Sequence, residues 1–341
     1  MKVLRYLGWS LLTLALLGGV ALLVAAWVYR DIPAEVLEAR YTTPASRFIN
    51  IDGVRIHYRD EGSGPVIVLI HANFSSLIDW DPVVAELTSG YRVIRFDMTS
   101  HGLTGPDPSG DYSLPRTISL AEQFIDALGL EKFSIGGTSL GGTVSLHYTS
   151  RHPERVDRLI LLSPGALEGR SQARRGVPAA AVILEYILPR ALPKFMLSSA
   201  YGDKSKLSDE MIDRWHDLWL REGQRHAQLA RLSQYESGDL EGIVREIRRP
   251  TLLMWGEANP QAEVGQAYEL EDMLENVASL DMIIYPGVGH MANQEAGTQI
   301  GRDIRAWMDG KLDSRYRIRP AADQTDPESG PEPGEKQAAG E

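Results

Sequence analysis

The chain has 341 residues, is 43% hydrophobic and carries a formal net charge of −11 at pH 7. This length allows one large domain or two ordinary ones, and no block of Lys and Arg stands out that would meet a nucleic-acid backbone. Cysteine is absent, which excludes disulfides, Cys-ligated zinc, iron–sulfur clusters and a thiol nucleophile.

An uncharged, apolar segment runs from Leu7 to Val28. As a helix, its 22 residues would extend over about 33 Å, which is enough to cross the hydrocarbon core of a bilayer. We therefore interpret 7–29 as a transmembrane helix or signal anchor behind a short tail, 1–6. A cleaved signal peptide is the alternative, because Val24-Ala25-Ala26 loosely fits a cleavage site. The short tail favours a single-pass topology with the soluble domain in the periplasm, and cleavage would instead give a secreted protein.

The body of the chain, from about Ser46 to Leu312, alternates short β-rich runs with helical stretches. Its later runs are almost continuously apolar, which is typical of parallel strands that are covered on both faces. Asp52-Gly53 predicts a tight hairpin between the first two runs. The expected strands are Arg47–Ile51, Val54–Tyr58, Val66–Ile70, Arg92–Phe96, Lys132–Ile135, Arg158–Leu162, Thr251–Trp255 and Asp281–Tyr285.

The alternation stops over 164–247, where only helical patterns occur. We interpret this span as a helical lid over the carboxyl edge of the sheet, where open α/β sheets bind their ligands. The lid divides the core into 46–163 and 248–312. Ordinary helix packing is the safer interpretation of the apolar residues in this span, because a helix must bury one side anyway. The residues that could instead line an acyl site are Val182, Ile183, Leu184, Ile187, Leu188, Phe195, Met196, Trp215 and Trp219.

The C-terminal segment has a different composition from the body. From about Ala321 to Glu341 it contains almost nothing apolar that is larger than Ala. Such a segment cannot bury enough surface to offset the entropy of ordering. We therefore assign 313–341 to a disordered tail.

The most informative motif is Gly137-Thr138-Ser139-Leu140-Gly141, between an apolar strand and a helix. A G-x-S-x-G turn needs its glycines because the turn is sharp and the flanking positions lie close to neighbouring backbone. It raises the Ser139 hydroxyl above the sheet edge, at a helix N-terminus whose dipole and free N–H groups stabilise negative charge. In this context the motif indicates a serine nucleophile.

From about Phe48 to Met308 the chain resembles serine-nucleophile proteins of the α/β-hydrolase fold, such as esterases, lipases and lactonases. The resemblance implies a mostly parallel central sheet flanked by helices, with a helical lid. It also implies that Ser139 is the nucleophile, that His290 is the general base, and that the N–H groups of Leu140 and Asn73 form the oxyanion hole. The stretches that carry it are His71-Ala72-Asn73-Phe74, Asp97 to Thr104 (DMTSHGLT), the Ser139 turn, Pro153-Glu154-Arg155-Val156, Trp255-Gly256-Glu257 and Pro286-Gly287-Val288-Gly289-His290.

The position of the third triad member departs from the family pattern. Asn259 stands where the family has a carboxylate, and Ser163 stands at the position where some relatives carry the acid instead. An amide can orient a histidine, but it cannot stabilise an imidazolium and its NH₂ can favour the wrong tautomer. Three interpretations stay open: a slow Ser–His dyad, a loss of hydrolysis, or a displaced acid that reaches His290. The candidates for the displaced acid are Glu257, Glu168 and Glu263.

A second departure is Ala72, where the family has glycine. Glycine at this position permits a backbone angle that alanine tolerates poorly. Asn73 beside it could add a side-chain donor to the oxyanion hole. A neutral change of loop shape explains the substitution equally well.

Ser139 excludes the relatives that use an aspartate nucleophile, namely haloalkane dehalogenases and epoxide hydrolases. No H-E-x-x-H motif or carboxylate ligand spacing predicts a metal, and no other cofactor is expected. We expect ester or lactone hydrolysis through an acyl-serine intermediate. The substrate would be a small ester-like molecule, and the apolar lid beside a bilayer anchor suits a lipid-like one. C–C bond hydrolysis of a dienoate-type substrate stays open, and so does a catalytically weak or inactive ligand-binding protein on the same fold.

Overall fold

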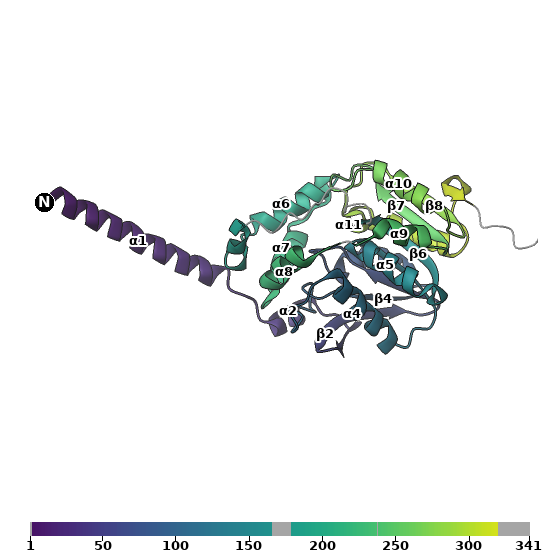
Figure 1. The fold of residues 1–341 in the computed structure, drawn as a ribbon, viewed down its shortest axis with the longest axis horizontal. Coiled ribbons are helices and arrows are strands. Elements are labelled where there is room, and N and C mark those ends of the chain that lie inside the picture. The colour runs from purple at the N-terminus through teal and green to yellow at the C-terminus, as the bar shows by residue number, and fades with distance from the viewer. Residues whose placement is uncertain (1, 166–178, 237, 320–341) are drawn as a thin grey trace, which may run out of the picture.

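A computed structural model describes residues 2–165, 179–236 and 238–319 of the chain. Its centre is a nine-stranded sheet in the order β1-β2-β4-β3-β5-β6-β7-β8-β9, in which β3 to β8 are parallel and β1, β2 and β9 add antiparallel edges (Figure 1). The strands are β1 Ser46–Ile51, β2 Val54–Gly62, β3 Val66–Ile70, β4 Arg92–Phe96, β5 Phe133–Ser139, β6 Val156–Pro164, β7 Thr251–Gly256, β8 Leu280–Tyr285 and β9 Arg317–Arg319. The predicted α/β-hydrolase fold is thereby confirmed.

Helices cover both faces of this sheet. Along β3 the side chains alternate, so that Val68 and Ile70 join the cluster under α4, α5, α9 and α10, while Ile67 and Leu69 join the cluster under α3 and α12. The helices are α1 Lys2–Val28, α2 Ala34–Tyr41, α3 Asp81–Leu87, α4 Leu114–Ala127, α5 Leu140–Arg151, α6 Ala191–Ala200, α7 Asp209–Trp219, α8 Gln224–Gln234, α9 Leu240–Glu246, α10 Gly265–Met273, α11 Ala292–Glu295 and α12 Gly297–Met308.

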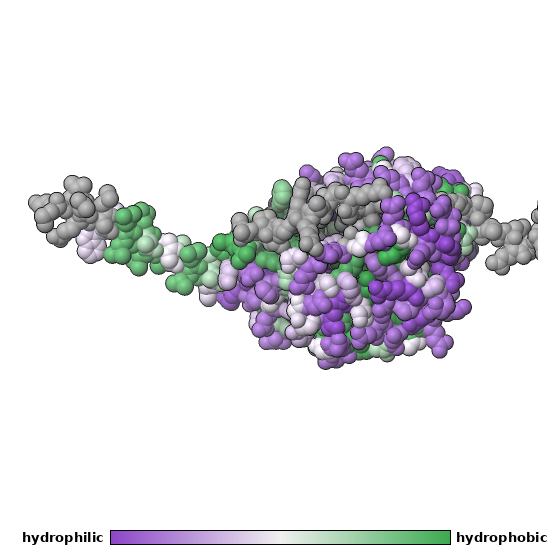
Figure 2. All heavy atoms as spheres, viewed as in Figure 1, coloured by the Kyte–Doolittle hydropathy of each residue, from purple (hydrophilic) through white to green (hydrophobic). Residues whose placement is uncertain are grey.

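Helix α1 extends away from the body as a single rod (Figure 1), and its described side chains are largely apolar (Figure 2). In the described part of the chain it is the one helix long and apolar enough to cross a membrane. The span is Trp9–Val28, 20 residues with a mean hydropathy of 2.4 and no part buried against the body. A signal sequence would have the same properties.

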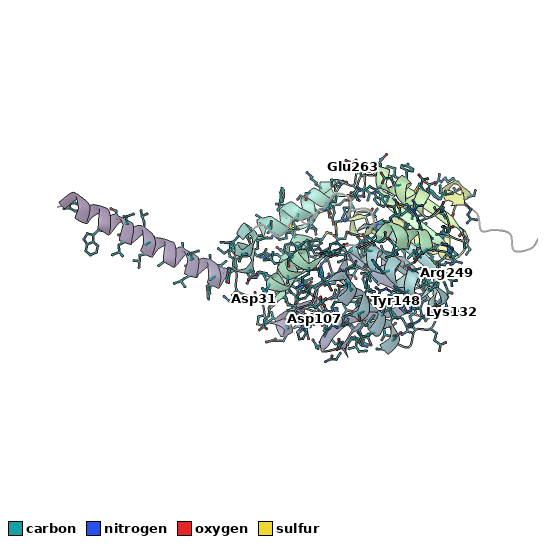
Figure 3. All side chains as sticks on the ribbon, in the orientation of Figure 1. Asp31, Asp107, Lys132, Tyr148, Arg249 and Glu263 are labelled. Atoms are coloured by element: carbon teal, nitrogen blue, oxygen red, sulfur yellow. The ribbon has the colours of Figure 1, made fainter. Side chains whose placement is uncertain are left out.

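The chain after α1 attaches to the lid. Ile32 forms an isolated parallel bridge with Arg221, in which the Ile32 N–H donates to the Leu220 carbonyl at 2.7 Å. Asp31, at the junction between α1 and the body (Figure 3), accepts a hydrogen bond from Arg225 at 2.6 Å. The segment that follows the apolar helix is therefore joined to the α7–α8 connection.

The helical insertion has two parts. Helices α6 and α7 build a separate apolar cluster that includes Leu197, Trp215 and Trp219. Helix α9 instead contributes Val244 to the large cluster under α5. The lid predicted over 164–247 therefore ends, as a separate layer, before α9, because the apolar side of α9 packs on the core.

The start of the predicted disordered tail has regular structure. A 3₁₀ turn at Ser314–Tyr316 leads into β9, which pairs antiparallel with β8. Arg317 donates to the buried carboxylate of Asp281 at 3.1 Å, and Trp307 donates to the same carboxylate at 2.9 Å. The boundary at 313 was wrong because this short polar strand is stabilised by a partner strand and not by its own apolar content. Residues 320–341 lie outside the described residues.

Asp97, at the carboxyl end of β4, fixes the loop of the DMTSHGLT stretch. Its buried carboxylate accepts hydrogen bonds from the N–H groups of Leu77 at 2.8 Å and Leu103 at 2.9 Å, and it lies 2.7 Å from Nδ1 of His57. Burial opposes its ionisation, but the bonds from His57 and Leu77 outweigh burial and lower the pKa of Asp97. This carboxylate therefore connects β2, β4 and the two loops beside the Ser139 turn.

We predict that Asp97→Ala lowers the free energy of unfolding by about 3–5 kcal/mol, because it leaves buried N–H donors, which now bond to the carboxylate, without an acceptor. The measurement is chemical denaturation of the full chain in detergent. Asp60→Ala is the control, since Asp60 pairs with Arg92 at a partly exposed site and should cost no more than about 1 kcal/mol. Equal losses in the two variants would contradict a special role for Asp97.

Candidate active site

Ser139 occupies a strained turn between β5 and α5. It is the last residue of β5 and the residue before α5, with φ 50° and ψ −119°. A non-glycine residue with this backbone costs about 1–3 kcal/mol, so the surrounding structure must hold it there. The turn leaves the serine side chain mostly buried, but facing a pocket.

The glycines of the turn are required by close backbone approach. A Cβ on Gly141 would lie 2.2 Å from the Ile70 carbonyl oxygen, and one on Gly137 would lie 2.3 Å from the Gly141 carbonyl carbon. Neither contact is possible for a real side chain. The sequence prediction that these glycines permit a sharp turn therefore has a specific cause, which is the packing of α5 against the end of β3.

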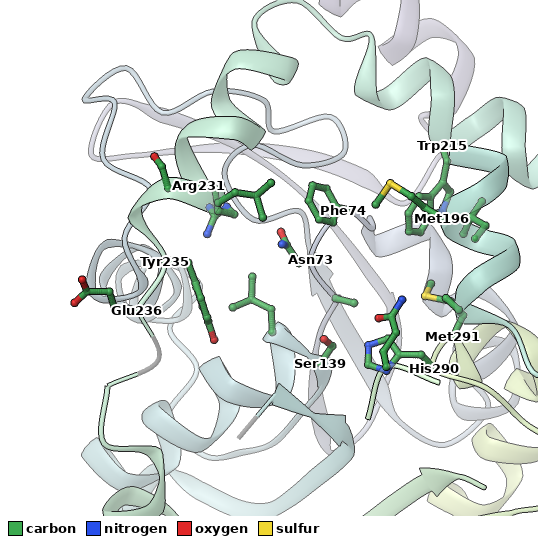
Figure 4. A pocket seen from close by; sticks show the side chains of 17 residues that line it. Asn73, Phe74, Ser139, Met196, Trp215, Arg231, Tyr235, Glu236, His290 and Met291 are labelled. Carbon is green, nitrogen blue, oxygen red and sulfur yellow. The ribbon is translucent and has the colours of Figure 1, made fainter. Parts of the chain in front are cut away.

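A pocket of about 540 Å³ opens beside Ser139 at the carboxyl edge of the sheet. Figure 4 shows Ser139 and His290 next to each other at one end of the pocket, with Arg231 and Glu236 away from them. No direct hydrogen bond joins Ser139 and His290 among the contacts of the described residues. The lining residues are Ala72, Asn73, Phe74, Ser139, Leu140, Met196, Leu197, Ala200, Trp215, Arg231, Leu232, Ser233, Tyr235, Glu236, Gln261, His290 and Met291.

His290 follows β8 and is held from the lid side. The backbone N–H of His290 donates to the Ala200 carbonyl at the end of α6, at 2.7 Å. The imidazole is 4% exposed, and burial lowers its pKa from 6.5 to about 4. Burial accounts for this shift, and no carboxylate is among the side-chain hydrogen-bond partners of His290 in the described part of the chain.

Asn259 contacts His290 from the turn after β7. Its Nδ2 lies 3.1 Å from Nδ1 of His290. Its Oδ1 accepts two backbone hydrogen bonds, from the N–H groups of Gln261 and Ala262, each at 3.0 Å. The structure thus brings together Ser139, His290 and the residue at the acid position, and it places an amide nitrogen against the imidazole.

The candidate replacement acids lie elsewhere. Glu257 is exposed and accepts a 3.4 Å bond from the Gly287 N–H, and Glu263 is exposed at the surface (Figure 3). Glu168 lies outside the described residues. Ser163, at the alternative acid position, is fully buried in β6.

A buried carboxylate that the sequence analysis did not single out, Glu295, also lies near the His290 loop. It accepts bonds from the N–H groups of Gly289 at 3.0 Å, Gly202 at 3.0 Å and Asp203 at 2.8 Å. It therefore joins the loop that carries His290 to the end of α6. No pattern in the sequence marks Glu295 for this role, because its partners are backbone groups from two distant segments.

The oxyanion loop differs from the expectation about Ala72. Ala72 is buried without a left-handed backbone, and Phe74 instead has a positive φ of 61°. The expected strain from alanine is therefore absent at position 72. Leu140 is the first residue of α5, so its N–H has no intrahelical acceptor. The Asn73 side-chain amide lies 3.0 Å from Nε2 of His101, in the loop after β4.

The lid contributes a smaller apolar wall than predicted. Met196, Leu197 and Trp215 line the pocket, whereas Phe195 is 70% exposed and Ile183 is 54% exposed. For Phe195 the difference arises because one side of α6 faces the pocket and the other faces outward, and composition alone does not distinguish these sides.

Arg231 on α8 is a pocket residue that the sequence analysis missed. Its guanidinium is fully buried and donates to Ser100 Oγ and to the Thr99 carbonyl, each at 2.8 Å. No carboxylate of the described residues pairs with it, and burial lowers the pKa of Arg231 to about 10. Arg231 thus joins helix α8 of the lid to the loop after β4 by hydrogen bonds. Within the described residues, no group of His, Asp and Glu side chains is arranged to hold a metal ion.

Comparisons with known proteins agree with this architecture. The alpha/beta hydrolase fold family model matches residues 65–181. A 2-hydroxy-6-oxo-6-(2'-aminophenyl)hexa-2,4-dienoic acid hydrolase from Metapseudomonas resinovorans is 30% identical over 268 residues, which cover 76% of this chain and 89% of that protein. The chain therefore belongs to the α/β-hydrolase fold family.

Two solved structures are similar in fold. A serine hydrolase involved in carbazole degradation, the CarC enzyme, is 26% identical with a TM-score of 0.65, covering 77% of this chain and 98% of its own. A membrane phospholipase A described as a bacterial virulence factor is 22% identical with a TM-score of 0.65, covering 91% of this chain and 99% of its own. The second likeness concerns the fold alone.

We predict that Gly141→Ala destabilises the Ser139 turn, because its Cβ cannot coexist with the Ile70 carbonyl. Overpacking of this kind costs about 1–3 kcal/mol and moves the backbone. Chemical denaturation should show this loss. Gly265→Ala is the control: no atom lies within 4 Å of its added Cβ, so stability should stay the same or rise by up to about 1 kcal/mol. A Gly141→Ala protein as stable as the wild type would refute the packing argument.

Proposed function

We propose that this protein is a membrane-anchored serine hydrolase that cleaves a carboxylic ester or lactone, with Ser139 as nucleophile and His290 as base. The observation that carries the proposal is the strained Ser139 turn, next to His290 in one pocket at the carboxyl edge of the sheet. Strain of this kind is maintained at functional sites because it aims a reactive group. Hydrolase relatives within the same family support the reaction class.

The proposed reaction is acyl transfer to water. Ser139 Oγ attacks the carbonyl carbon while its proton passes to an unprotonated Nε2 of His290. The carbonyl electrons move to the oxygen, which the N–H groups of Leu140 and Asn73 stabilise. The leaving alkoxide takes the proton from His290, and water then attacks the acyl-serine by the reverse sequence, releasing the acid and restoring Ser139.

The anchored state rests on α1, which is exposed, apolar and long enough to cross a bilayer. The apolar wall of Met196, Leu197 and Trp215 suits an acyl chain. A dienoate-type C–C hydrolysis is the second candidate, because the Metapseudomonas relative is named for a dienoic acid. Both reactions use the same nucleophile, so they are distinguished by substrate and not by the first step.

The direct test is covalent labelling of the full chain in detergent with a fluorophosphonate probe. We expect mass spectrometry to find the probe on Ser139, and hydrolysis of short acyl esters to be lost in Ser139→Ala. Ser233→Ala is the matched control, because Ser233 lines the same pocket and its hydroxyl donates to the Ala230 carbonyl at 2.8 Å. Labelling that persists in Ser139→Ala would contradict the assigned nucleophile. A wild type that neither labels nor hydrolyses, while binding a ligand in the pocket, would favour the non-catalytic alternative.

The pH dependence of labelling is a separate prediction. His290 acts as a base only when it is neutral, so the rate is present above its pKa and is lost as pH falls through it. With the pKa of His290 lowered to about 4, the rate should stay level from pH 8 to about 5 and halve near pH 4. A midpoint at or above 6.5, with the protein still folded, would mean that a carboxylate reaches His290 after all.

A further inference from the structure

The direction of the Asn259 amide is fixed by its own turn. Only the amide oxygen can accept the N–H groups of Gln261 and Ala262, each at 3.0 Å. A half-turn of the amide would bring its NH₂ against these two donors and lose both bonds. The indole of Trp255 also donates to the Ala262 carbonyl at 2.9 Å, which holds the turn from its other side. The amide nitrogen is therefore the atom that faces His290.

This direction determines where His290 carries its proton. An amide nitrogen donates and does not accept, so Nδ1 of His290, 3.1 Å away, must be the acceptor. A neutral imidazole has one N–H, which must then be on Nε2. We propose that Asn259 is a positioning residue that holds His290 in the Nε2–H tautomer, so that Ser139 meets a hydrogen-bond donor where a triad supplies a base. This inference rests on the proposed function for its catalytic consequence, but not for the tautomer itself.

The surrounding charges do not oppose this tautomer. Glu257 and Glu263 are exposed. The carboxylate of Glu295 already accepts hydrogen bonds from the backbone N–H groups of Gly289, Gly202 and Asp203. The described groups thus offer His290 no carboxylate that would attract a proton to Nδ1. Asn259 is its one side-chain hydrogen-bond partner among the described contacts.

The tautomer restricts the first chemical step. The Ser139 proton must move to Nε2 as Oγ attacks, but in the resting site Nε2 already carries a proton. The productive tautomer has its proton on Nδ1, where it would face the NH₂ of Asn259. Reaching that state requires the amide to turn away from Gln261 and Ala262. We therefore expect slow turnover through a minor tautomer.

The same tautomer changes what the end of the pocket binds. His290 Nε2–H, the Ser139 hydroxyl and the N–H of Leu140 are all donors there. A carboxylate can accept from such a set without taking up a proton, whereas an unprotonated Nε2 would repel it. We expect simple carboxylates to bind more tightly to the wild type than to a variant with an ordinary triad.

Asn259→Asp is the decisive variant, with Ala258→Asp as its matched control. In Asn259→Asp one carboxylate oxygen keeps the two backbone bonds and the other accepts from Nδ1–H, which frees Nε2. Ala258→Asp adds the same charge at an exposed neighbouring position and should change nothing. The first readout is ¹⁵N NMR of the full chain in detergent at pH 8, with labelled histidine and His290 assigned through His290→Asn. We expect Nε2–H in the wild type and in Ala258→Asp, and Nδ1–H in Asn259→Asp.

Two further readouts should move in opposite directions. Fluorophosphonate labelling of Ser139 should accelerate in Asn259→Asp by at least tenfold and up to about 10⁴-fold, the scale of an Asp–Asn exchange in a serine protease triad. Affinity for butyrate at pH 8 should fall at least tenfold in the same variant. A variant that only damaged the fold would not raise one quantity while lowering the other.

The outcomes separate the two proposals. An Nδ1–H signal from His290 in the wild type overturns the tautomer inference, whatever the rates. Equal labelling and butyrate binding in the wild type and Asn259→Asp would overturn its functional consequence. If the wild type shows Nε2–H but Ser139 stays unlabelled in every variant, the inference stands and the proposed hydrolase function fails.

Discussion

The site depends on how closely the start of α5 approaches the end of β3. Only a glycine at 141 lets the helix backbone come against the Ile70 carbonyl, and Ser139, two residues earlier, has a positive φ. Helix α5 begins at Leu140, directly after Ser139, so its first N–H groups, which have no intrahelical acceptor, follow the serine. The steric constraint at Gly141 thus lies within the turn that carries the candidate nucleophile and the donors that follow it.

Two related side chains in this protein show what a carboxylate does and what an amide cannot do. Asp97 and Asn259 each follow a strand of the sheet, each accept two backbone N–H groups, and each face Nδ1 of a buried histidine. The Asp97–His57 distance is 2.7 Å, and the Asn259–His290 distance is 3.1 Å. The shorter contact is the one with an ionisable acceptor, as charge-assisted bonds are. The buried environment of His290 therefore lacks the charge that the fold supplies to His57.

Continuous apolar runs made the central strands predictable from sequence. Val66–Ile70 and Arg92–Phe96 were predicted with their observed limits, because both strands are buried and end at loops. The fold class followed from the alternation of such runs with helices. The Ser139 turn and the His290 loop could be named from local motifs, since their chemistry needs fixed residues at fixed spacing.

Features that depend on distant partners were not predictable in the same way. The short strand β9 exists because β8 offers an edge and Asp281 offers a carboxylate to Arg317. The strain expected at Ala72 occurs at Phe74, because the loop path depends on its packing against His101, which accepts the Phe74 N–H at 2.9 Å. The direction of the Asn259 amide depends on two N–H groups in its own turn, and a residue name carries no such information.

The connection between α1 and the body gives the lid a second role in the structure. The first residues after α1 bond to the lid: Ile32 to Leu220, and Asp31 to Arg225. Further along, the hydroxyl of Tyr41 donates to Asp217 on α7 at 2.7 Å. The lid in turn is clamped to the core by Arg231, through groups in the loop after β4. The segment after α1 is therefore bonded to the helices that wall the pocket and also to the sheet, where Arg59 on β2 donates to the Tyr41 carbonyl at 3.1 Å.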